Sequence, residues 1–195
     1  KSGGKIKTGI NPGEGAFYGP KLEFVLRDAI GRDWQCGTTQ VDFNLPERFG
    51  AFYIDADGGK KTPVMVHRAI CGSMERFIGI LIEHYAGNFP LWLAPEQVRV
   101  ITIGEGEPLL NYAKQIVNEL RVHQVRATGD YGSDPMKAKI ANAEQAKVHT
   151  MLVIGGRDME AGAVSVRLHG KGNVGAKPKG EVVADILAAI RERLA

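Results

Sequence analysis

A serine and an arginine open the strongest helical pattern in the first half of the chain. Ser73 is a candidate N-cap for a helix over 74–85, and Arg76 stands where a capping box would carry Glu or Gln. A cation in the first turn opposes the helix dipole by ~0.3–1 kcal/mol, whereas a helix N-terminus attracts anions. Arg76 is therefore a candidate phosphate ligand. The competing interpretation is an exposed arginine paired with Glu75 or Glu83.

Polar residues alternate along a predicted strand over 34–42. Because successive side chains of a strand point to opposite faces, every second residue shares a face. Here these residues are Cys36, Thr38, Gln40 and Asp42. Such a stripe can line a pocket, although a solvent-facing side of an antiparallel sheet is the commoner arrangement.

Two further side chains could bind ligands. His67 interrupts the apolar run 63–70, where a lone histidine is more often a hydrogen-bonded core residue than a metal ligand. No Cys/His cluster of the zinc type surrounds it in sequence. Lys21 follows the glycine-flanked aromatic turn 15–20 and could reach a carboxylate or phosphate, although a solvated lysine is the usual outcome.

Hydrophobic periodicity predicts two different architectures that would position these groups. In the first half we expect strands closing onto one helix, hence an antiparallel sheet. In the second half strands and helices alternate, so we expect a small α/β domain with a mixed, mostly parallel sheet. The predicted strands are 22–26, 34–43, 63–70, 98–103, 124–127, 150–154 and 163–168, and the predicted helices are 74–85, 107–120, 136–147 and 181–194.

Prolines and glycines mark the boundaries between these patterns. An apolar plug between Pro90 and Pro95 separates the two halves, so we expect domains over 1–94 and 95–195. The glycine-rich segment 170–180 is predicted to be a flexible basic loop rather than a phosphate cradle, because it lacks the strand-to-helix context of a P-loop.

Composition narrows the functional class without naming it. With 44% hydrophobic and 24% charged residues, the 195-residue chain fits a soluble globular protein with no membrane-spanning segment. The net charge of +3 permits an anionic partner but does not require one. Only two cysteines, far apart, argue against a disulfide framework and favour the cytoplasm. The chain opens without Met, so we expect a fragment of a longer protein.

A series of segments then becomes recognisable. These segments are 13–21, 34–38, 42–49, 64–70 and 72–79, continuing through 90–98 and more weakly to the end. The series resembles the C-terminal part of the threonyl-tRNA synthetase family, which belongs to the class II aminoacyl-tRNA synthetases. The resemblance implies the last portion of a class II catalytic domain, containing the third class II motif at 72–77, followed by an anticodon-binding domain.

The resemblance also implies an activity: ATP, with Mg²⁺, converts threonine to threonyl-adenylate, and threonine is then transferred to tRNA(Thr). It makes Arg76 the arginine that binds the ATP phosphates and Lys21 a second catalytic residue. Gln35, Thr38 and Ser73 match adenine and ribose contacts, while Tyr18 and Gln40 match the threonine pocket. His67 matches one of three protein ligands of a catalytic zinc that binds the threonine amine and hydroxyl.

In the second half the resemblance places Ser133, Asp158 and Arg167 near the anticodon. The other two zinc ligands and the first two class II motifs, including the one that builds the homodimer interface, are expected upstream of Lys1. We therefore expect the isolated chain to be inactive and to hold zinc weakly. The alternative is a non-catalytic, synthetase-like module that binds tRNA or another RNA.

Overall fold

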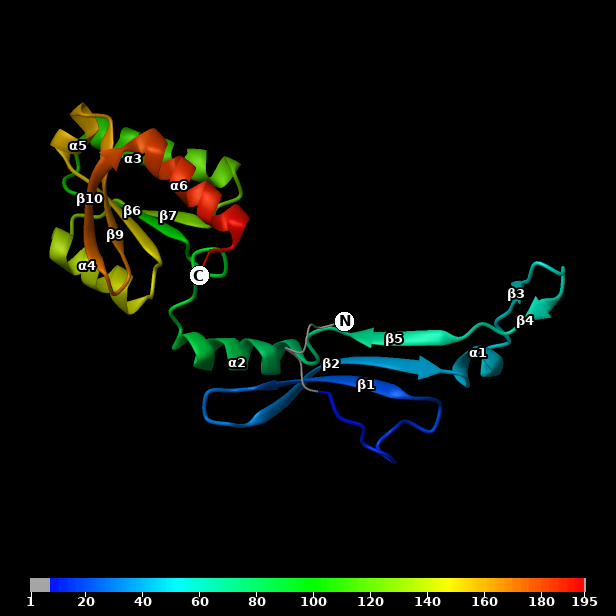
Figure 1. Cartoon of the computed structure of the whole chain (residues 1–195). Helices are drawn as coiled ribbons and strands as arrows, with labels where there is room; N and C mark the ends of the chain where they lie inside the picture. The colour runs from blue at the N-terminus through cyan, green and yellow to red at the C-terminus, as the bar shows by residue number, and fades with distance from the viewer. Residues whose placement is uncertain (1–7, 195) are drawn as a thin grey trace. The chain divides into compact units, whose positions relative to one another are not determined.

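The computed structural model describes residues 8–194 and separates into two compact units, Lys1–His84 and Tyr85–Ala195. Figure 1 shows one unit built around three long strands and the other built around a five-stranded sheet. The α/β and α+β fold class predicted from the sequence is confirmed. None of the helices within 8–194 is long and apolar enough to cross a bilayer.

The first unit is an antiparallel sheet with strand order β1-β2-β5, in which the long strand β2 is central. The strands lie side by side in Figure 1, with helix α2 next in the chain after β5. A short helix and a two-stranded hairpin, neither of them predicted, are inserted between β2 and β5. The elements are β1 (Lys21–Arg27), β2 (Asp33–Asp42), α1 (Leu45–Arg48), β3 (Tyr53–Ile54), β4 (Lys60–Lys61), β5 (Met65–Ala69) and α2 (Met74–Tyr85).

The second unit has a mixed sheet with strand order β10-β9-β8-β6-β7. Strand β6 pairs in parallel with β7 and β8, while β9 and β10 add an antiparallel edge. The elements are β6 (Val98–Thr102), α3 (Glu107–Val122), β7 (Ala127–Asp130), α4 (Met136–Gln145), β8 (Thr150–Ile154), α5 (Gly156–Glu160), β9 (Ala163–Leu168), β10 (Gly172–Pro178) and α6 (Lys179–Glu192).

Two apolar clusters hold the second unit together. The larger joins α3 and α6 to the sheet and includes Val100, Ile116 and Ile186; the smaller joins α4 to the sheet through Ala143 and Met151. In Figure 1, α3 and α6 lie together and α4 lies apart from them. Each apolar helix stripe is thus buried against the sheet, which is the usual way an α/β unit removes apolar surface from water.

The structure corrects two sequence predictions in this unit. The segment 170–180 is not a flexible loop: residues 172–178 form β10, paired with β9, and α6 begins at Lys179. The hydrogen bonds between paired strands join backbone atoms and do not depend on side chains. A glycine-rich segment can therefore form a strand although its composition is typical of a loop. The predicted strand 124–127 begins only at Ala127, because α3 runs to Val122 and Gln124 adopts a positive φ of 62° after it.

Candidate functional site

One face of the β1-β2-β5 sheet gathers most of the polar residues predicted in the first unit. Register places Gln40 between Lys21 on β1 and His67 on β5, and Thr38 lies opposite Glu23. Directly opposed residues of an antiparallel pair project to the same side. The cross-strand pairs therefore bring side chains from three strands onto one surface, called here the polar face: Lys21, Glu23, Gln35, Thr38, Gln40, Asp42 and His67.

A β-bulge decides which residues belong to the polar face. Phe24 pairs with Gly37 and the next β1 residue pairs with Gln35, so Cys36 is an extra residue without a β1 partner. The bulge interrupts the predicted alternation at Cys36 and brings Gln35 onto the polar face. Gln35 Nε2 donates to Glu23 Oε1 at 3.0 Å.

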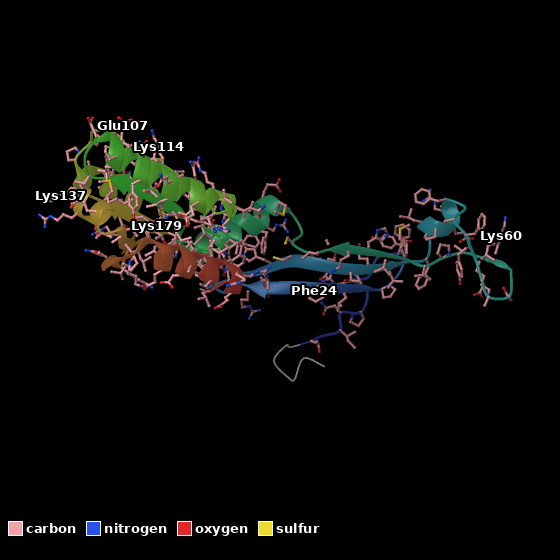
Figure 2. The ribbon with its side chains drawn as sticks, turned by 90° about the horizontal axis from the view of Figure 1, so that it is seen from above. Phe24, Lys60, Glu107, Lys114, Lys137 and Lys179 are labelled. Atoms are coloured by element: carbon pink, nitrogen blue, oxygen red, sulfur yellow. The ribbon has the colours of Figure 1, made fainter. Side chains whose placement is uncertain are left out.

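Apolar side chains on one face of this sheet are exposed to solvent, while most polar side chains on the opposite face are partly or fully buried. Leu22, Phe24 and Val66, which project from the other face, are 57%, 43% and 59% exposed. Figure 2 labels Phe24 on β1. On the polar face, His67 is half-buried and Asp42 is fully buried. The polar stripe is therefore not simply the solvent-facing side of an amphipathic sheet, as the competing interpretation required.

His67 is held by a buried carboxylate. Its Nε2 atom lies 2.7 Å from Asp42 Oδ2, while Asp42 Oδ1 accepts the backbone N–H groups of Asn44 and Leu45 at 2.8 and 3.0 Å. Burial raises the pKa of Asp42, but the hydrogen bonds from Leu45, His67 and Asn44 outweigh it, so the pKa lies below its ordinary value. The carboxylate orients the imidazole and leaves Nδ1 outside this bond.

This geometry tests the predicted zinc. A metal-bound histidine commonly has its other ring nitrogen held by a carboxylate, and His67 has this support. A tetrahedral catalytic site needs three protein ligands, however, and residues 8–194 contain no cluster of three His, Cys, Asp or Glu side chains able to hold a metal. The described residues thus supply one supported candidate ligand, not a complete zinc site.

Four of the remaining polar-face residues, Lys21, Glu23, Gln35 and Gln40, already have partners. Lys21 forms an ion pair with Glu23, and this contact raises the pKa of Lys21 above its ordinary value. The Tyr18 hydroxyl donates to Gln40 Oε1 at 3.4 Å, and its ring lies 6.2 Å from that of His67. Glu23, which the sequence interpretation missed, joins Lys21 to Gln35; the alternation of β1 places it on the same face as Lys21.

Ser73 caps α2 as predicted: its hydroxyl accepts the backbone N–H of Arg76 at 3.3 Å. The preceding Gly72 has φ of +67°, and a Cβ there would lie 2.9 Å from the carbonyl oxygen of Cys36. Only glycine fits this close approach readily. The start of α2 is therefore held beside the bulged segment of β2, which brings the turn over 72–77 to the strand that carries Gln35 and Thr38.

The Arg76 guanidinium is not paired with either glutamate considered from the sequence. Glu75 accepts from Ser73 Oγ at 2.6 Å, and Glu83 forms an ion pair with Arg32. Within residues 8–194, the Arg76 side chain has no hydrogen bond or ion pair. An exposed, uncompensated guanidinium at a helix N-terminus is a suitable anion ligand.

In the second unit, two of the predicted anticodon residues follow parallel strands. Exposed Ser133 lies in the loop after β7, and Asp158 lies in α5 directly after β8. The carboxyl ends of parallel strands are the usual ligand-binding edge of such sheets. Asp158 already has local partners, since its carboxylate accepts from Gly155 N at 2.9 Å and from Ser165 Oγ at 3.2 Å.

Arg167 lies on β9 opposite Met151 of β8 and Asn173 of β10. It sits two residues farther along β9 than Ser165, which pairs with Val153. Its Nε atom is buried and has no hydrogen-bond partner among residues 8–194. An unsatisfied buried donor costs about 1–3 kcal/mol, so Arg167 has donor capacity that a ligand could use. Asp158 does not pair with it in the described part of the chain.

Comparisons with known proteins divide the chain in the same order as its architecture. Residues 4–85 match the family described as "tRNA synthetase class II core domain (G, H, P, S and T)". Residues 97–188 match the family described as "Anticodon binding domain". The two matches correspond to the unit with the polar face and to the unit with the mixed sheet.

Individual relatives are consistent with this division. A threonine--tRNA ligase of Rhodopseudomonas palustris is 62% identical over 188 residues, covering 96% of this chain and 28% of the relative. The enzyme of the same name from Chelativorans sp. is 55% identical over 187 residues, with the same coverages. Among solved structures, the RNA binding domain of threonyl-tRNA synthetase from Cryptosporidium parvum has a TM-score of 0.82 at 36% identity, covering 91% of this chain and 45% of that one.

The chain therefore belongs to the class II aminoacyl-tRNA synthetases, combining part of the core domain with an anticodon-binding domain. Within that class its curated relatives are threonine--tRNA ligases, of whose length it spans 28%. The resemblance stated from the sequence is confirmed.

Proposed function

We propose that this chain is the part of a threonine–tRNA ligase that contacts ATP and threonine with the polar face and the tRNA anticodon with the mixed-sheet unit. The observation that carries this proposal is one assembly: a polar face built from three strands beside a helix start that presents Arg76, whose side chain has no partner within residues 8–194. The ligase names of the relatives support it and do not favour a non-catalytic RNA-binding module.

In this proposal Arg76 binds the phosphates of Mg²⁺-bound ATP at the positive end of the α2 dipole. A fixed cation and oriented N–H groups stabilise charge that develops when the carboxylate of threonine attacks the α-phosphate and pyrophosphate leaves. Gln35, Thr38 and Ser73 contact the adenosine portion. Lys21 also acts on the adenylate, with Glu23 keeping it protonated and oriented before ATP enters.

Threonine would lie against Tyr18 and Gln40, close to His67. We propose that His67 supplies one zinc ligand through Nδ1, with Asp42 orienting the ring; the other ligands belong to the longer ligase. When bound, zinc would coordinate the amine and hydroxyl of threonine and so distinguish it from valine. What this chain contributes is a preoriented imidazole, held from Nε2 by a carboxylate at 2.7 Å.

Ser133, Asp158 and Arg167 are proposed to contact the anticodon of tRNA(Thr), where exposed loop bases present their edges to side chains. We further propose a cytoplasmic, homodimeric parent enzyme. The domain boundary is proposed at 94/95, which lies between the two matched regions, 4–85 and 97–188.

The decisive experiment is ATP–pyrophosphate exchange by a complete ligase that contains this segment. Arg76→Ala should lower the exchange rate by about 10²–10³-fold, the usual effect of removing one charge-stabilising donor. Arg68→Ala is the matched control, because Arg68 pairs with Thr39 and stacks on Phe24 on the other face of the sheet. Near-normal exchange by the Arg76 variant would refute the assignment.

His67 is tested separately by metal analysis of the same ligase. His67→Ala should reduce the zinc content and allow activation of valine, whereas a variant of exposed His84 should retain the metal. Unchanged zinc content in the His67 variant would remove this residue from the ligand set.

A further inference from the structure

The mixed-sheet unit has a polar hollow that the proposed anticodon residues do not use. It has a volume of about 340 Å³ and lies between α3 and β7, the edge strand of the sheet. Its lining includes Lys114, Asn118, Arg121, Thr128, Gly129 and Tyr131. Ser133, Asp158 and Arg167 are not part of the lining.

Helical spacing aligns the polar groups contributed by α3. Lys114, Asn118 and Arg121 follow the pattern i, i+4, i+7, so they form one stripe along the helix. All three are exposed, while neighbouring Ile116 and Leu120 are buried in the core. Figure 2 labels Lys114 on α3. The stripe therefore does not serve to pack the helix against the sheet.

The cations are held in place by neighbours that leave their charge uncompensated. Arg121 Nε donates to the carbonyl oxygen of Ala127 at 2.8 Å, and the other guanidinium nitrogens have no partner in the described residues. The Lys114 ammonium lies 6.0 Å from the ring centroid of Tyr131. Neither cation forms an ion pair within residues 8–194.

The Tyr131 ring lies directly against the backbone of β7. A Cβ at Gly129 would lie 2.1 Å from the Tyr131 ring, so only glycine allows the ring to occupy this position. Partial burial raises the pKa of the Tyr131 hydroxyl, although nearby Arg121 acts in the opposite direction. The hollow thus combines a fixed aromatic ring with two cations.

Among residues 8–194, no carboxylate lines the hollow. The nearest acid by hydrogen bonding is Glu96, which accepts from the Thr128 hydroxyl. Its charge is balanced by Arg99, which donates two hydrogen bonds of 2.8 and 2.5 Å to it. The described lining consequently carries two positive charges, one amide and the hydroxyls of Thr128 and Tyr131, with no opposing charge of its own.

We propose that this hollow binds an RNA backbone phosphate on Lys114 and Arg121, with an adjacent nucleotide against Tyr131. Guanidinium and ammonium groups recognise phosphate, and an aromatic ring accepts a base or ribose face. The amide of Asn118 can bond a ribose 2′-hydroxyl. The inference rests on the proposed binding of tRNA and adds a second contact area on the same unit.

The test measures binding of a tRNA(Thr) transcript to the full chain by fluorescence anisotropy across a range of KCl concentrations. Each lost phosphate contact lowers the slope of log K against log[salt] by roughly 0.7–0.9. The double variant K114Q/R121Q should therefore bind about tenfold or more weakly at low salt, with a slope smaller by roughly 0.7–0.9, the change for one lost phosphate contact. K177Q is the matched control, because Lys177 is already paired with Glu181 and Asp185.

Two further variants distinguish the contribution of the Tyr131 ring to RNA binding from that of the two cations. Tyr131→Leu should weaken binding about 5- to 150-fold, the range expected for losing one stacked base, with the salt slope retained. Gly129→Ala leaves every charge in place but displaces the ring, and should reproduce the Tyr131→Leu effect. Thermal unfolding of each variant verifies that the unit remains folded.

The outcomes distinguish the two proposals. If the unaltered chain shows no salt-dependent binding of tRNA, tRNA recognition by this unit and this inference are both overturned. If the unaltered chain binds and K114Q/R121Q matches it in affinity and slope, only the hollow is excluded. Loss of affinity and slope in K114Q/R121Q, with K177Q unchanged, supports the inference.

Discussion

His67 on β5 and Asp42 on β2 form a hydrogen bond of 2.7 Å between Nε2 and Oδ2 across adjacent strands. The two residues are not directly opposite each other, since Gln40 faces His67 and Met65 faces Asp42. The bond therefore runs diagonally across the polar face, within reach of a long side chain. It couples the imidazole to the turn into α1, because Asp42 also accepts the N–H groups of Asn44 and Leu45.

Asp42→Asn should change how the first unit responds to acid. Hydrogen bonds hold the pKa of Asp42 below its ordinary 3.8, so the carboxylate stabilises the fold above that pH and the stabilisation is lost as pH falls through the lowered value. Asparagine cannot ionise and lacks this component. The difference in free energy of unfolding between the two proteins should shrink from pH 6 to pH 2.

This comparison can be made with urea and tryptophan fluorescence. Trp34 and Trp92 are the two tryptophans of the chain, one in each unit, so a Trp92→Phe background reports the first unit alone. A stability difference that stays constant over the whole pH range would show that the Asp42 charge contributes nothing to folding.

Ser73→Ala should destabilise the first unit by about 0.5–1 kcal/mol, the lower part of the N-cap range, since the capping bond to Arg76 N is 3.3 Å long. Ser73→Asn, which can still accept that bond, is the conservative control and should lose less. The measurement is urea unfolding followed by Trp34. Equal stability of the alanine variant and the unaltered chain would mean that the cap is dispensable for folding.

Periodicity predicted most elements, and α2, β8 and β9 begin and end where the sequence patterns placed them. Strand alternation also predicted that Thr38 and Gln40 share a face, and the structure agrees. These predictions succeed because the signal is local: it depends on side chains a few residues apart.

The elements that were missed depend on distant parts of the chain. The bulge at Cys36 is a shift in the pairing of β2 with β1, and no pattern within the β2 sequence predicts it. Strand β10 depends on backbone bonds to β9 and contains glycines that favour loops. The His67–Asp42 bond could have been anticipated only after the β2–β5 register was known, although alternation alone places Asp42 on the face of Gln40.

Asp158 offers a test of whether a predicted anticodon contact also stabilises the fold. Asp158→Ala would leave the Gly155 N–H and the Ser165 hydroxyl without their acceptor, at an expected cost of about 1–2 kcal/mol to the second unit. The measurement is urea unfolding followed by Trp92 in a Trp34→Phe background. Ser165→Ala is the control, because it removes only one of the two bonds and should cost less.

If Asp158 only binds RNA, its replacement should affect binding and not stability. In that case Asp158→Ala would leave the unfolding transition unchanged and weaken only tRNA(Thr) binding. If the variant loses stability and affinity together, the carboxylate positions the α5 turn, and the loss of affinity follows from that displacement.

His149 should make the second unit sensitive to mild acid. Burial lowers its pKa below the ordinary 6.5, and the nearby charges of Lys171 and His169 lower it further. As pH falls below 6.5 the unfolded chain binds a proton at this residue more readily than the folded chain, so the free energy of unfolding decreases. This loss ends once the pH is below the lowered pKa, because both states are then protonated.

His149→Gln should therefore flatten the stability of the second unit between pH 7 and pH 5, measured by Trp92 fluorescence in the Trp34→Phe background. Lys171→Gln should have a smaller effect in the same direction, since it removes one of the charges that disfavour the imidazolium. His123→Gln is the control: His123 is exposed beyond the end of α3 and its variant should retain the full pH dependence. If His149→Gln keeps the slope of the unaltered chain, another group titrates in this range, and the burial of His149 is not what makes the unit acid-sensitive.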